Sequence, residues 1–367
     1  MSAHARTPVS LVTGFLGSGK TTLVNRLLAD GRMADTAVIV NEFGAIGLDH
    51  DLVAASDDAI VLLENGCLCC AVRGDLVRTL DELHRRRAGG ALPPFARVLF
   101  ETSGLADPGP VIQALAAEPT LRARYTLGGV VTVVDAVNGP ATLDAHDEAL
   151  RQVAVADRLV VTKLDLVDGP GARADAEAGL RRRLARINPA ADLALASERL
   201  APEFYFDARV PEGADGYRRA TGWLRADRYP RSVPGAEEIA DARHDPRVRA
   251  TCVVREEPMT EAALRLLVDA LSRNLGPSLL RVKGLISVAE RPGTPAVLHG
   301  AQALLHDVEW LDRWPGEDRR TRIVFITIDR DPDEAGELVD LACRLAGGAA
   351  RARSTMRERA SPVPPAR

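Results

Sequence analysis

The feature that most constrains the fold is a glycine-rich loop near the N-terminus. Residues 14–21, GFLGSGKT, fit the pattern G-x-x-x-x-G-K-[ST]. In such a loop the glycines let backbone N–H groups turn inward around phosphate oxygens, the lysine reaches the β- and γ-phosphates, and the hydroxyl binds Mg²⁺. A short aliphatic run, residues 11–13, predicts a strand before the loop, and an amphipathic helix is predicted from Lys20 onward. The positive end of that helix favours bound phosphate, so the sequence predicts a nucleotide-phosphate site.

Each residue of this loop, and the threonine after it, is expected to contact the nucleotide. Lys20 and Thr21 are also expected to be catalytic, because Lys20 brings positive charge to the γ-phosphate and Thr21 holds Mg²⁺. A chance match to the motif is the alternative, and the strand and helix on either side argue against it. The expected contact residues are Gly14, Phe15, Leu16, Gly17, Ser18, Gly19, Lys20, Thr21 and Thr22.

The first half of the chain alternates short aliphatic runs with helical stretches. The expected strands are 9–13, 37–41, 59–64, 97–101, 129–135, 157–162 and 191–195, and the expected helices are 20–29, 75–88, 109–117, 144–156 and 172–187. Several strands are apolar with little alternation, as in VVTVV at 130–134. Strands covered on both faces have this composition. The sequence therefore predicts an α/β P-loop NTPase fold with a doubly wound, mostly parallel sheet.

The second half has a different pattern. Residues 201–249 are rich in Pro, Gly, Arg and Asp and have poor periodicity, which indicates a linker or insertion. Strand-like runs then follow one another with few helices, which predicts a smaller α+β domain over 250–348. Residues 349–367, rich in Arg, Ala and Pro, are expected to be a disordered tail. The P-loop domain is assigned to residues 1–200.

Polar residues close most of the expected strands: Asn41–Glu42, Glu64–Asn65, Glu101, Asp135 and Thr162–Lys163. Ligands bind at the carboxyl ends of parallel strands, so these residues are expected to surround one crevice beside the phosphate loop. Glu101 is expected to be catalytic and to hold Mg²⁺ or its waters; a helix cap or solvated acid is the alternative. Gly104 is expected to offer its backbone N–H to the γ-phosphate, a contact that hydrolysis would break.

A second nucleotide element follows the strand that ends near residue 162. Residues 162–165, TKLD, are similar to the N-K-x-D element of GTP-binding proteins. We expect Asp165 to accept hydrogen bonds from guanine and the stem of Lys163 to pack along the base, with Thr162 in the position of the asparagine. Adenine lacks those donors and would leave a buried carboxylate unpaired. A solvated loop is the alternative, and Asn188 is a further candidate for a base contact.

Three of the five cysteines, Cys67, Cys69 and Cys70, fall within four positions. Thiolates at this spacing favour Zn²⁺ and similar ions, including Co²⁺. Glu42 could supply a fourth ligand or sense the γ-phosphate. Buried structural thiols and a redox pair are the alternatives.

Composition excludes several classes of protein. A net charge of −4 from 47 basic and 51 acidic residues argues against nucleic acid or an anionic membrane as a partner. No apolar run approaches the roughly 20 residues that span a bilayer. The N-terminus is short and polar, unlike a secretory signal, and the clustered thiols are typical of a reducing cytoplasm.

Five stretches of the nucleotide half carry a family resemblance: 14–23 (GFLGSGKTTL), 41–44 (NEFG), 64–70 (ENGCLCC), 101–108 (ETSGLADP) and 162–165 (TKLD). In the second half residues 280–285 (LRVKGL) carry it. Together they resemble the CobW-type family of GTP-dependent metallochaperones, over nearly the whole chain. The chain departs from the family in two ways. Thr162 replaces the usual asparagine, and His244 is the only histidine in 201–249, where many members are histidine-rich.

The resemblance implies GTP hydrolysis with Mg²⁺, binding of Zn²⁺ or Co²⁺ at Cys67, Cys69 and Cys70, and transfer of the ion to a client protein. Our leading hypothesis is a cytoplasmic GTPase whose nucleotide state controls metal transfer. The alternatives are a non-catalytic metal-binding or storage protein that nucleotide stabilises, and a regulatory GTPase whose cysteines sense redox state. The oligomeric state stays open, a homodimer included.

Overall fold

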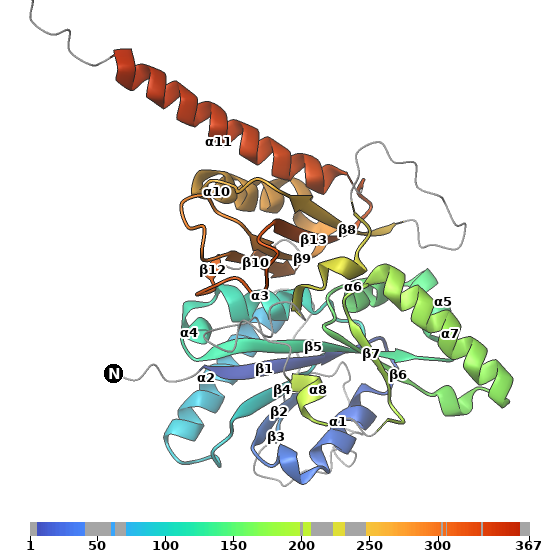
Figure 1. Cartoon of the computed structure of the whole chain (residues 1–367). Coiled ribbons are helices and arrows are strands. Elements are labelled where there is room, and N and C mark those ends of the chain that lie inside the picture. The colour runs from blue at the N-terminus through green and yellow to red at the C-terminus, as the bar shows by residue number, and fades with distance from the viewer. Residues whose placement is uncertain are drawn as a thin grey trace, which may run out of the picture. The chain divides into compact units, whose positions relative to one another are not determined.

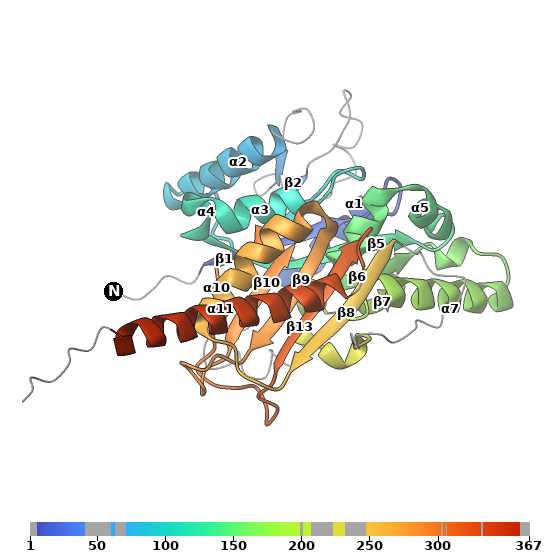
Figure 2. The ribbon, with the colours of Figure 1, turned by 90° about the horizontal axis from the view of Figure 1, so that it is seen from above.

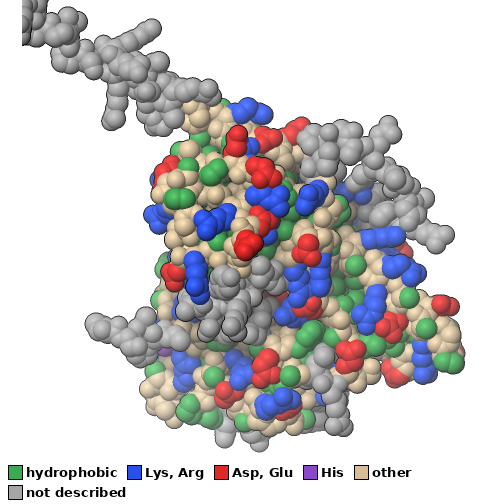
Figure 3. Space-filling view, in the orientation of Figure 1, with side chains coloured by type: hydrophobic (Ala, Val, Ile, Leu, Met, Phe, Trp, Pro, Cys, Tyr) green, Lys and Arg blue, Asp and Glu red, His purple; other side chains and the backbone are tan. Residues whose placement is uncertain are grey.

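The computed structural model describes residues 6–40, 60–62, 71–198, 201–206, 223–231, 247–301, 304–305, 307–331 and 333–359. The chain divides into two compact units (Figure 1). Residues 1–210 with 241–248 form the first unit, and 211–240 with 249–367 form the second. On the face in Figure 3, basic and acidic side chains are interspersed over both units.

The first unit is built on a seven-stranded sheet in the order β3-β2-β4-β1-β5-β6-β7. Its strands are β1 (Thr7–Thr13), β2 (Thr36–Val40), β3 (Ile60–Leu62), β4 (Arg97–Glu101), β5 (Tyr125–Asp135), β6 (Arg158–Thr162) and β7 (Asp192–Leu195). All neighbouring pairs are parallel. The chain winds outward in both directions from the central β1, so the expected doubly wound P-loop fold is confirmed.

Helices cover both faces of this sheet (Figure 1). They are α1 (Lys20–Leu28), α2 (Ala71–Ala88), α3 (Gly109–Ala117), α4 (Pro119–Arg122), α5 (Gly139–Ala145), α6 (Asp147–Ala154), α7 (Pro170–Ile187) and α8 (Glu203–Phe206). α1 and α8 pack through Leu23 and Tyr205 against Val131 and Val133 of β5. Thr132 and Val134 alternate with those valines and face α6 on the other side.

The helix expected over residues 144–156 is present as α6, but it is shorter, spanning Asp147–Ala154. The structure has two helices there, α5 and α6, separated by His146 in an extended conformation (φ −132°, ψ 117°). The His146 ring stacks on Phe15 with 4.4 Å between centroids. Phe15 belongs to the phosphate loop, which is distant in sequence from His146. The helix is therefore interrupted where this contact forms, and local helix propensity does not predict the interruption.

The second unit contains a six-stranded sheet with the path β11-β10-β9-β13-β8, and β12 pairs with β10. Its elements are β8 (Val248–Arg255), α10 (Glu261–Ala270), β9 (Leu279–Ile286), β10 (Ala296–Ala301), β11 (Leu304–Leu305), β12 (Glu309–Trp310), β13 (Thr321–Ile328) and α11 (Glu334–Arg359). β9 pairs antiparallel with β10 and β13. Both helices lie across one face of the sheet (Figure 2), where Leu267 and Val339 join Ile323 and Phe325 in a core. The expected smaller α+β unit is confirmed.

The C-terminal helix is longer than expected. α11 continues to Arg359, so the expectation of a disordered tail from residue 349 is wrong for 349–359. That segment is rich in alanine and arginine, which are among the strongest helix formers. Residues 360–367 lie outside the described part of the chain.

Candidate functional site

The phosphate loop joins β1 to α1 and is held tightly against its neighbours. Gly14, Gly17 and Gly19 have φ values of 141°, 70° and 95°, which side-chain-bearing residues rarely adopt. A Cβ added at Gly14 would lie 2.3 Å from the carbonyl oxygen of Val133. One added at Gly104 would lie 2.7 Å from the backbone nitrogen of Leu16. Glycine is therefore required where the loop meets β5 and where the segment after β4 meets the loop.

The residues expected to be catalytic come together at the start of α1. The Thr21 hydroxyl donates to Glu101 Oε1 at 2.7 Å. Lys20 is 8% exposed, and its ammonium donates to the carbonyl of Phe15 at 3.3 Å. Glu101 is 3% exposed and is the last residue of β4, where it pairs with Val12 of β1. This register brings Glu101 to the phosphate loop, although it is 80 positions from Thr21 in the sequence.

The segment after β4, which contains Gly104, is fastened to α6 by a residue that the sequence did not single out. The side-chain amide of Gln152 donates to the carbonyls of Gly104 and Ala106, at 3.2 and 3.0 Å. Gln152 is 1% exposed. Nothing local marks it, since a glutamine in an amphipathic helix is ordinarily a surface residue.

The expected base-binding element places its residues in different environments. The Thr162 hydroxyl donates to the carbonyl of Ser18 at 2.7 Å, so it braces the phosphate loop against β6. Lys163 has a left-handed backbone (φ 59°), and its ammonium lies 2.8 Å from Asp135 Oδ2. Asp165, in the short helix η2 (Leu164–Leu166), is exposed.

Asp135 is held ionised although it is buried, with 7% of its surface exposed. Burial would raise its pKa, but hydrogen bonds from Lys163 and from the Asn138 side chain, with backbone N–H groups of Asn138 and Val137, outweigh burial and lower the pKa. The anion in turn fixes the position of the Lys163 ammonium. The sequence placed Asp135 at a strand end but did not assign this orienting role.

Asn188 does not take the role considered for it. Its amide nitrogen donates to the carbonyls of Val153, Ala154 and Ala156, at 2.8–3.0 Å, and it is 1% exposed. It therefore closes the end of α6 and is a structural residue.

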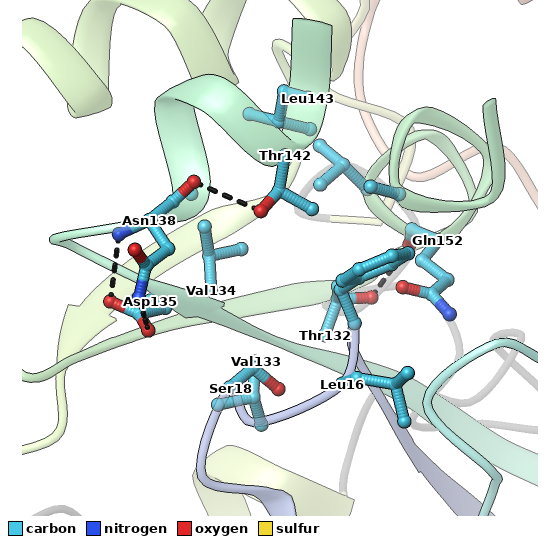
Figure 4. A pocket seen from close by; sticks show the side chains of 14 residues that line it. Leu16, Ser18, Thr132, Val133, Val134, Asp135, Asn138, Thr142, Leu143 and Gln152 are labelled. Carbon is cyan, nitrogen blue, oxygen red and sulfur yellow. Dashed lines mark hydrogen bonds between the residues drawn. The ribbon is translucent and has the colours of Figure 1, made fainter. Parts of the chain in front are cut away.

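A small pocket, of about 30 Å³, adjoins the phosphate loop (Figure 4). Phe15, Leu16 and Ser18 form its floor, and β5, α5 and α6 supply the remaining walls. Gln152 lines one side and Asp135 with Asn138 the other. The pocket thus lies between Gln152, which holds the Gly104 segment, and Asp135, which holds the Lys163 side chain.

Family comparisons agree with this geometry. Residues 8–194 match the family described as CobW/HypB/UreG, nucleotide-binding domain, and residues 248–342 match the cobalamin synthesis protein cobW C-terminal domain. The chain belongs to the CobW/HypB/UreG family. The resemblance drawn from the motifs is thereby confirmed.

Relatives within the CobW group are similar over different lengths. The zinc chaperone YjiA of Escherichia coli is 31% identical over 326 residues, which cover 89% of this chain and 95% of YjiA. The zinc chaperone CobW of a Sinorhizobium species is 36% identical over 199 residues, 47% of this chain and 54% of that protein, so the match spans about half of it. The crystal structure of Zn(II)-bound YjiA GTPase from E. coli superposes with a TM-score of 0.64 at 27% identity, covering 91% of this chain and 98% of that one.

The expected metal ligands of this CobW-family chain, Cys67, Cys69, Cys70 and Glu42, lie outside the described residues. Within the described part, no group of three or more His, Cys, Asp or Glu side chains could hold a metal ion. Cys252 is buried and Cys343 half-buried, both as free thiols of the second unit. None of the helices described is long and apolar enough to cross a membrane.

Proposed function

We propose that this CobW-family chain is a GTP-hydrolysing metallochaperone that binds Zn²⁺ or Co²⁺ and transfers the ion to a client metalloprotein in the cytoplasm. The observation that carries the proposal is the Thr21–Glu101 contact beside a buried lysine in a glycine-rich phosphate loop. The relatives support the same function, since they are named zinc chaperones and, in Schizosaccharomyces pombe, a zinc-regulated GTPase metalloprotein activator (33% identical over 188 residues, 49% of this chain and 43% of that protein).

The phosphates of GTP occupy the loop of residues 14–22. Backbone N–H groups freed by the positive-φ glycines point at phosphate oxygens, and the N-terminus of α1 adds its dipole. Lys20 leaves the Phe15 carbonyl to bind the β- and γ-phosphates.

The donor set beside the loop fits Mg²⁺. A hydroxyl and a carboxylate, from Thr21 and Glu101, lie 2.7 Å apart, and oxygens of these kinds are the ligands that Mg²⁺ takes in proteins. Thr21 and Glu101 would hold the ion, which supplies charge neutralisation as the bond to the γ-phosphate breaks. The backbone N–H of Gly104 senses whether that phosphate is present.

Guanine is recognised by the segment after β6. Asp165 is exposed and able to accept hydrogen bonds from the base, and Lys163 is fixed by Asp135 so that its stem can pack against the base. Thr162 contributes by bracing Ser18, which differs from the direct role of an asparagine.

Metal binding is assigned to Cys67, Cys69 and Cys70, with Glu42 as a further ligand. Glu42 and the cysteines follow β2 and β3, and β2 lies beside β4, whose last residue is Glu101. Loss of the γ-phosphate is proposed to reach the metal ligands through the segments that follow β2 and β3 in the sequence. We assign nucleotide binding and metal loading to residues 1–200, and client recognition to 201–249 or to 250–348.

GTP turnover by the full chain, measured beside Lys20→Ala, tests the proposal. We expect turnover that depends on Mg²⁺ and falls by at least about tenfold in the variant, because Lys20 neutralises charge that develops on the phosphates. Turnover that is unchanged in Lys20→Ala, or absent from both proteins, would favour the non-catalytic storage alternative. The metal content of anaerobically purified protein tests the redox-sensing alternative. Bound metal would favour the metallochaperone, and thiols without metal would favour redox sensing.

A further inference from the structure

A second cavity, of about 320 Å³, opens in the second unit on the face of the sheet opposite α10 and α11. In β13, Ile323 and Phe325 pack under the helices, so Arg322 projects from the other face. Leu285 of β9 pairs directly with Arg322, and both line the cavity. Its sheet wall therefore follows from the alternation of side chains along the strands.

The opposite wall is the segment 224–231, which contains the short helix η3 (Ala226–Arg228). The backbone N–H of Cys252 in β8 donates to the carbonyl of Pro230 at 2.8 Å. The backbones of Arg231 and Cys252 also form an isolated parallel β-bridge. Arg225, at the start of this wall, has a left-handed backbone (φ 45°). Such conformations are unfavourable for residues other than glycine and concentrate at functional sites.

The charge of the lining is positive. The lining contains four guanidinium groups and two carboxylates, from Arg225, Arg231, Arg320, Arg322, Asp227 and Asp318. Glu256, outside the lining, accepts a hydrogen bond from Arg320 at 3.1 Å, so one positive charge stays in excess when this carboxylate is counted. Asp318 is already bound by Arg320 at 2.9 and 3.0 Å and lies 3.5 Å from Arg322. Among the described residues the Nε of Arg322 is buried and has no hydrogen-bond acceptor.

The buried thiol at the base does not cancel this charge. Burial raises the pKa of Cys252 to about 11, although the guanidinium groups of Arg322 and Arg231 lower it. The thiol is therefore neutral near pH 7. Apolar side chains, Leu224, Val254 and Leu285, complete the lining.

We propose that this cavity, the arginine pocket, binds an oxyanion: a carboxylate or phosphate group on a small carbon skeleton. Arginine offers paired N–H donors that match the oxygens of these groups, and Arg231 and Arg322 are placed to supply them. The apolar walls suit the attached carbon atoms, and the cavity is of the size that small ligands occupy. The oxyanion belongs to a free small molecule or to an acidic side chain of a partner protein. All the residues that line the site belong to the second unit.

Calorimetric titration of the full chain tests this site. The protein is first saturated with a non-hydrolysable GTP analogue and Mg²⁺, so that the phosphate loop is filled up to its γ-phosphate site, and ionic strength is held constant. The probes are inorganic phosphate, succinate and a peptide rich in Asp and Glu. We expect saturable binding of at least one probe. Binding of phosphate or succinate identifies a free small molecule, and binding of the peptide alone identifies a protein side chain.

Three variants decide whether the arginine pocket is responsible. Arg231→Gln is expected to weaken binding by about tenfold or more, the loss of one charge-assisted hydrogen bond. Arg225→Gly removes a guanidinium from the lining and relieves the left-handed backbone, and it should weaken binding. Arg319→Gln removes an exposed charge from the neighbouring loop, outside the lining, and should change affinity less than about twofold. Absence of saturable binding, or equal losses in all three variants, would overturn the proposal.

Discussion

The hydroxyl of Thr21 donates a 2.7 Å hydrogen bond to the carboxylate of Glu101, which joins the first turn of α1 to the end of β4. The contact depends on the parallel β1–β4 pairing, because that register sets Glu101 opposite Val12. It also fixes the start of the segment that leads to Gly104, whose carbonyl is held by Gln152. The nucleotide loop and the segment expected to sense the γ-phosphate are therefore parts of one connected structure.

Replacing Glu101 with glutamine tests the negative charge of this side chain, because the size of the side chain is nearly unchanged. The amide can still accept the hydrogen bond from Thr21, but it removes the negative charge that favours Mg²⁺. We expect GTP turnover to fall by about 10²-fold, the effect of removing one charge-stabilising group from an active site, with the circular dichroism spectrum unchanged. Glu82→Gln makes the same chemical change on α2, where the side chain is 47% exposed, and should leave turnover intact. Equal turnover in the two variants would argue against the proposed role of Glu101.

Gly14→Ala should damage the phosphate loop itself. The new methyl group would lie 2.3 Å from the Val133 carbonyl oxygen at a φ of 141°. We expect the free energy of unfolding to fall by about 2 kcal/mol and nucleotide binding to be lost, measured by urea unfolding and nucleotide titration. At Gly31 an added methyl group has no atom within 4 Å, so Gly31→Ala is the matched control and should be near neutral. Unchanged stability and nucleotide binding in Gly14→Ala would contradict the close fit of Gly14 against Val133.

Asp165 should control the choice of base. Asp165→Ala is expected to weaken GDP binding by about tenfold or more, because a hydrogen-bonded carboxylate is lost. Binding of ADP, which lacks the matching donors, should not change. Displacement of a fluorescent GDP analogue by GDP and by ADP gives both affinities, and Asp168→Ala supplies the control from the same exposed turn. A parallel loss for both nucleotides would place guanine recognition elsewhere.

The second unit should show a pH dependence from Asp318. A bidentate hydrogen bond from Arg320 lowers the pKa of Asp318 from 3.8 to about 2. Because the folded pKa lies below the unfolded one, the unfolded chain binds more protons in this range. The stability that Asp318 contributes is thus complete above pH 4 and is lost as pH falls toward about 2.

Urea unfolding of the wild type and Asp318→Asn at pH 5, 3.5 and 2.5 measures this contribution. We expect the difference between the two midpoints to shrink as the pH falls. Asp312→Asn, an exposed carboxylate of the same unit, should show no such trend. A constant difference for Asp318→Asn would show that the ion pair does not titrate as described.

Local patterns were sufficient for the phosphate loop and the strands around it. The loop motif specifies its own backbone through three glycines, and continuous apolar runs such as β5 (Tyr125–Asp135) identify buried parallel strands. Glu101 was also identifiable, since strand ends meet at one edge of a parallel sheet. These features depend on neighbours in sequence or on a general rule of the fold.

The remaining details depend on contacts between distant segments. Gln152 holds carbonyls 46 and 48 positions away, and Thr162 donates to a carbonyl 144 positions away. Gln152 is not marked by spacing or composition, and the motif that contains Thr162 does not predict its contact with Ser18. The break between α5 and α6 at His146 coincides with the stacking of its ring on Phe15. The helix α11 continues past residue 349 because alanine and arginine are strong helix formers, although the composition of this segment is typical of a disordered tail.

Zinc affinity in the two nucleotide states tests the central claim, coupling between the phosphate loop and the thiol cluster, most directly. The full chain is titrated with Zn²⁺ against a competing chelator, once with a non-hydrolysable GTP analogue and once with GDP, and again as Cys67→Ser/Cys69→Ser. We predict that affinity differs between the nucleotide states by at least about fivefold, a typical coupling between sites, and that tight binding disappears in the double variant. Equal zinc affinities with the two nucleotides would contradict the account.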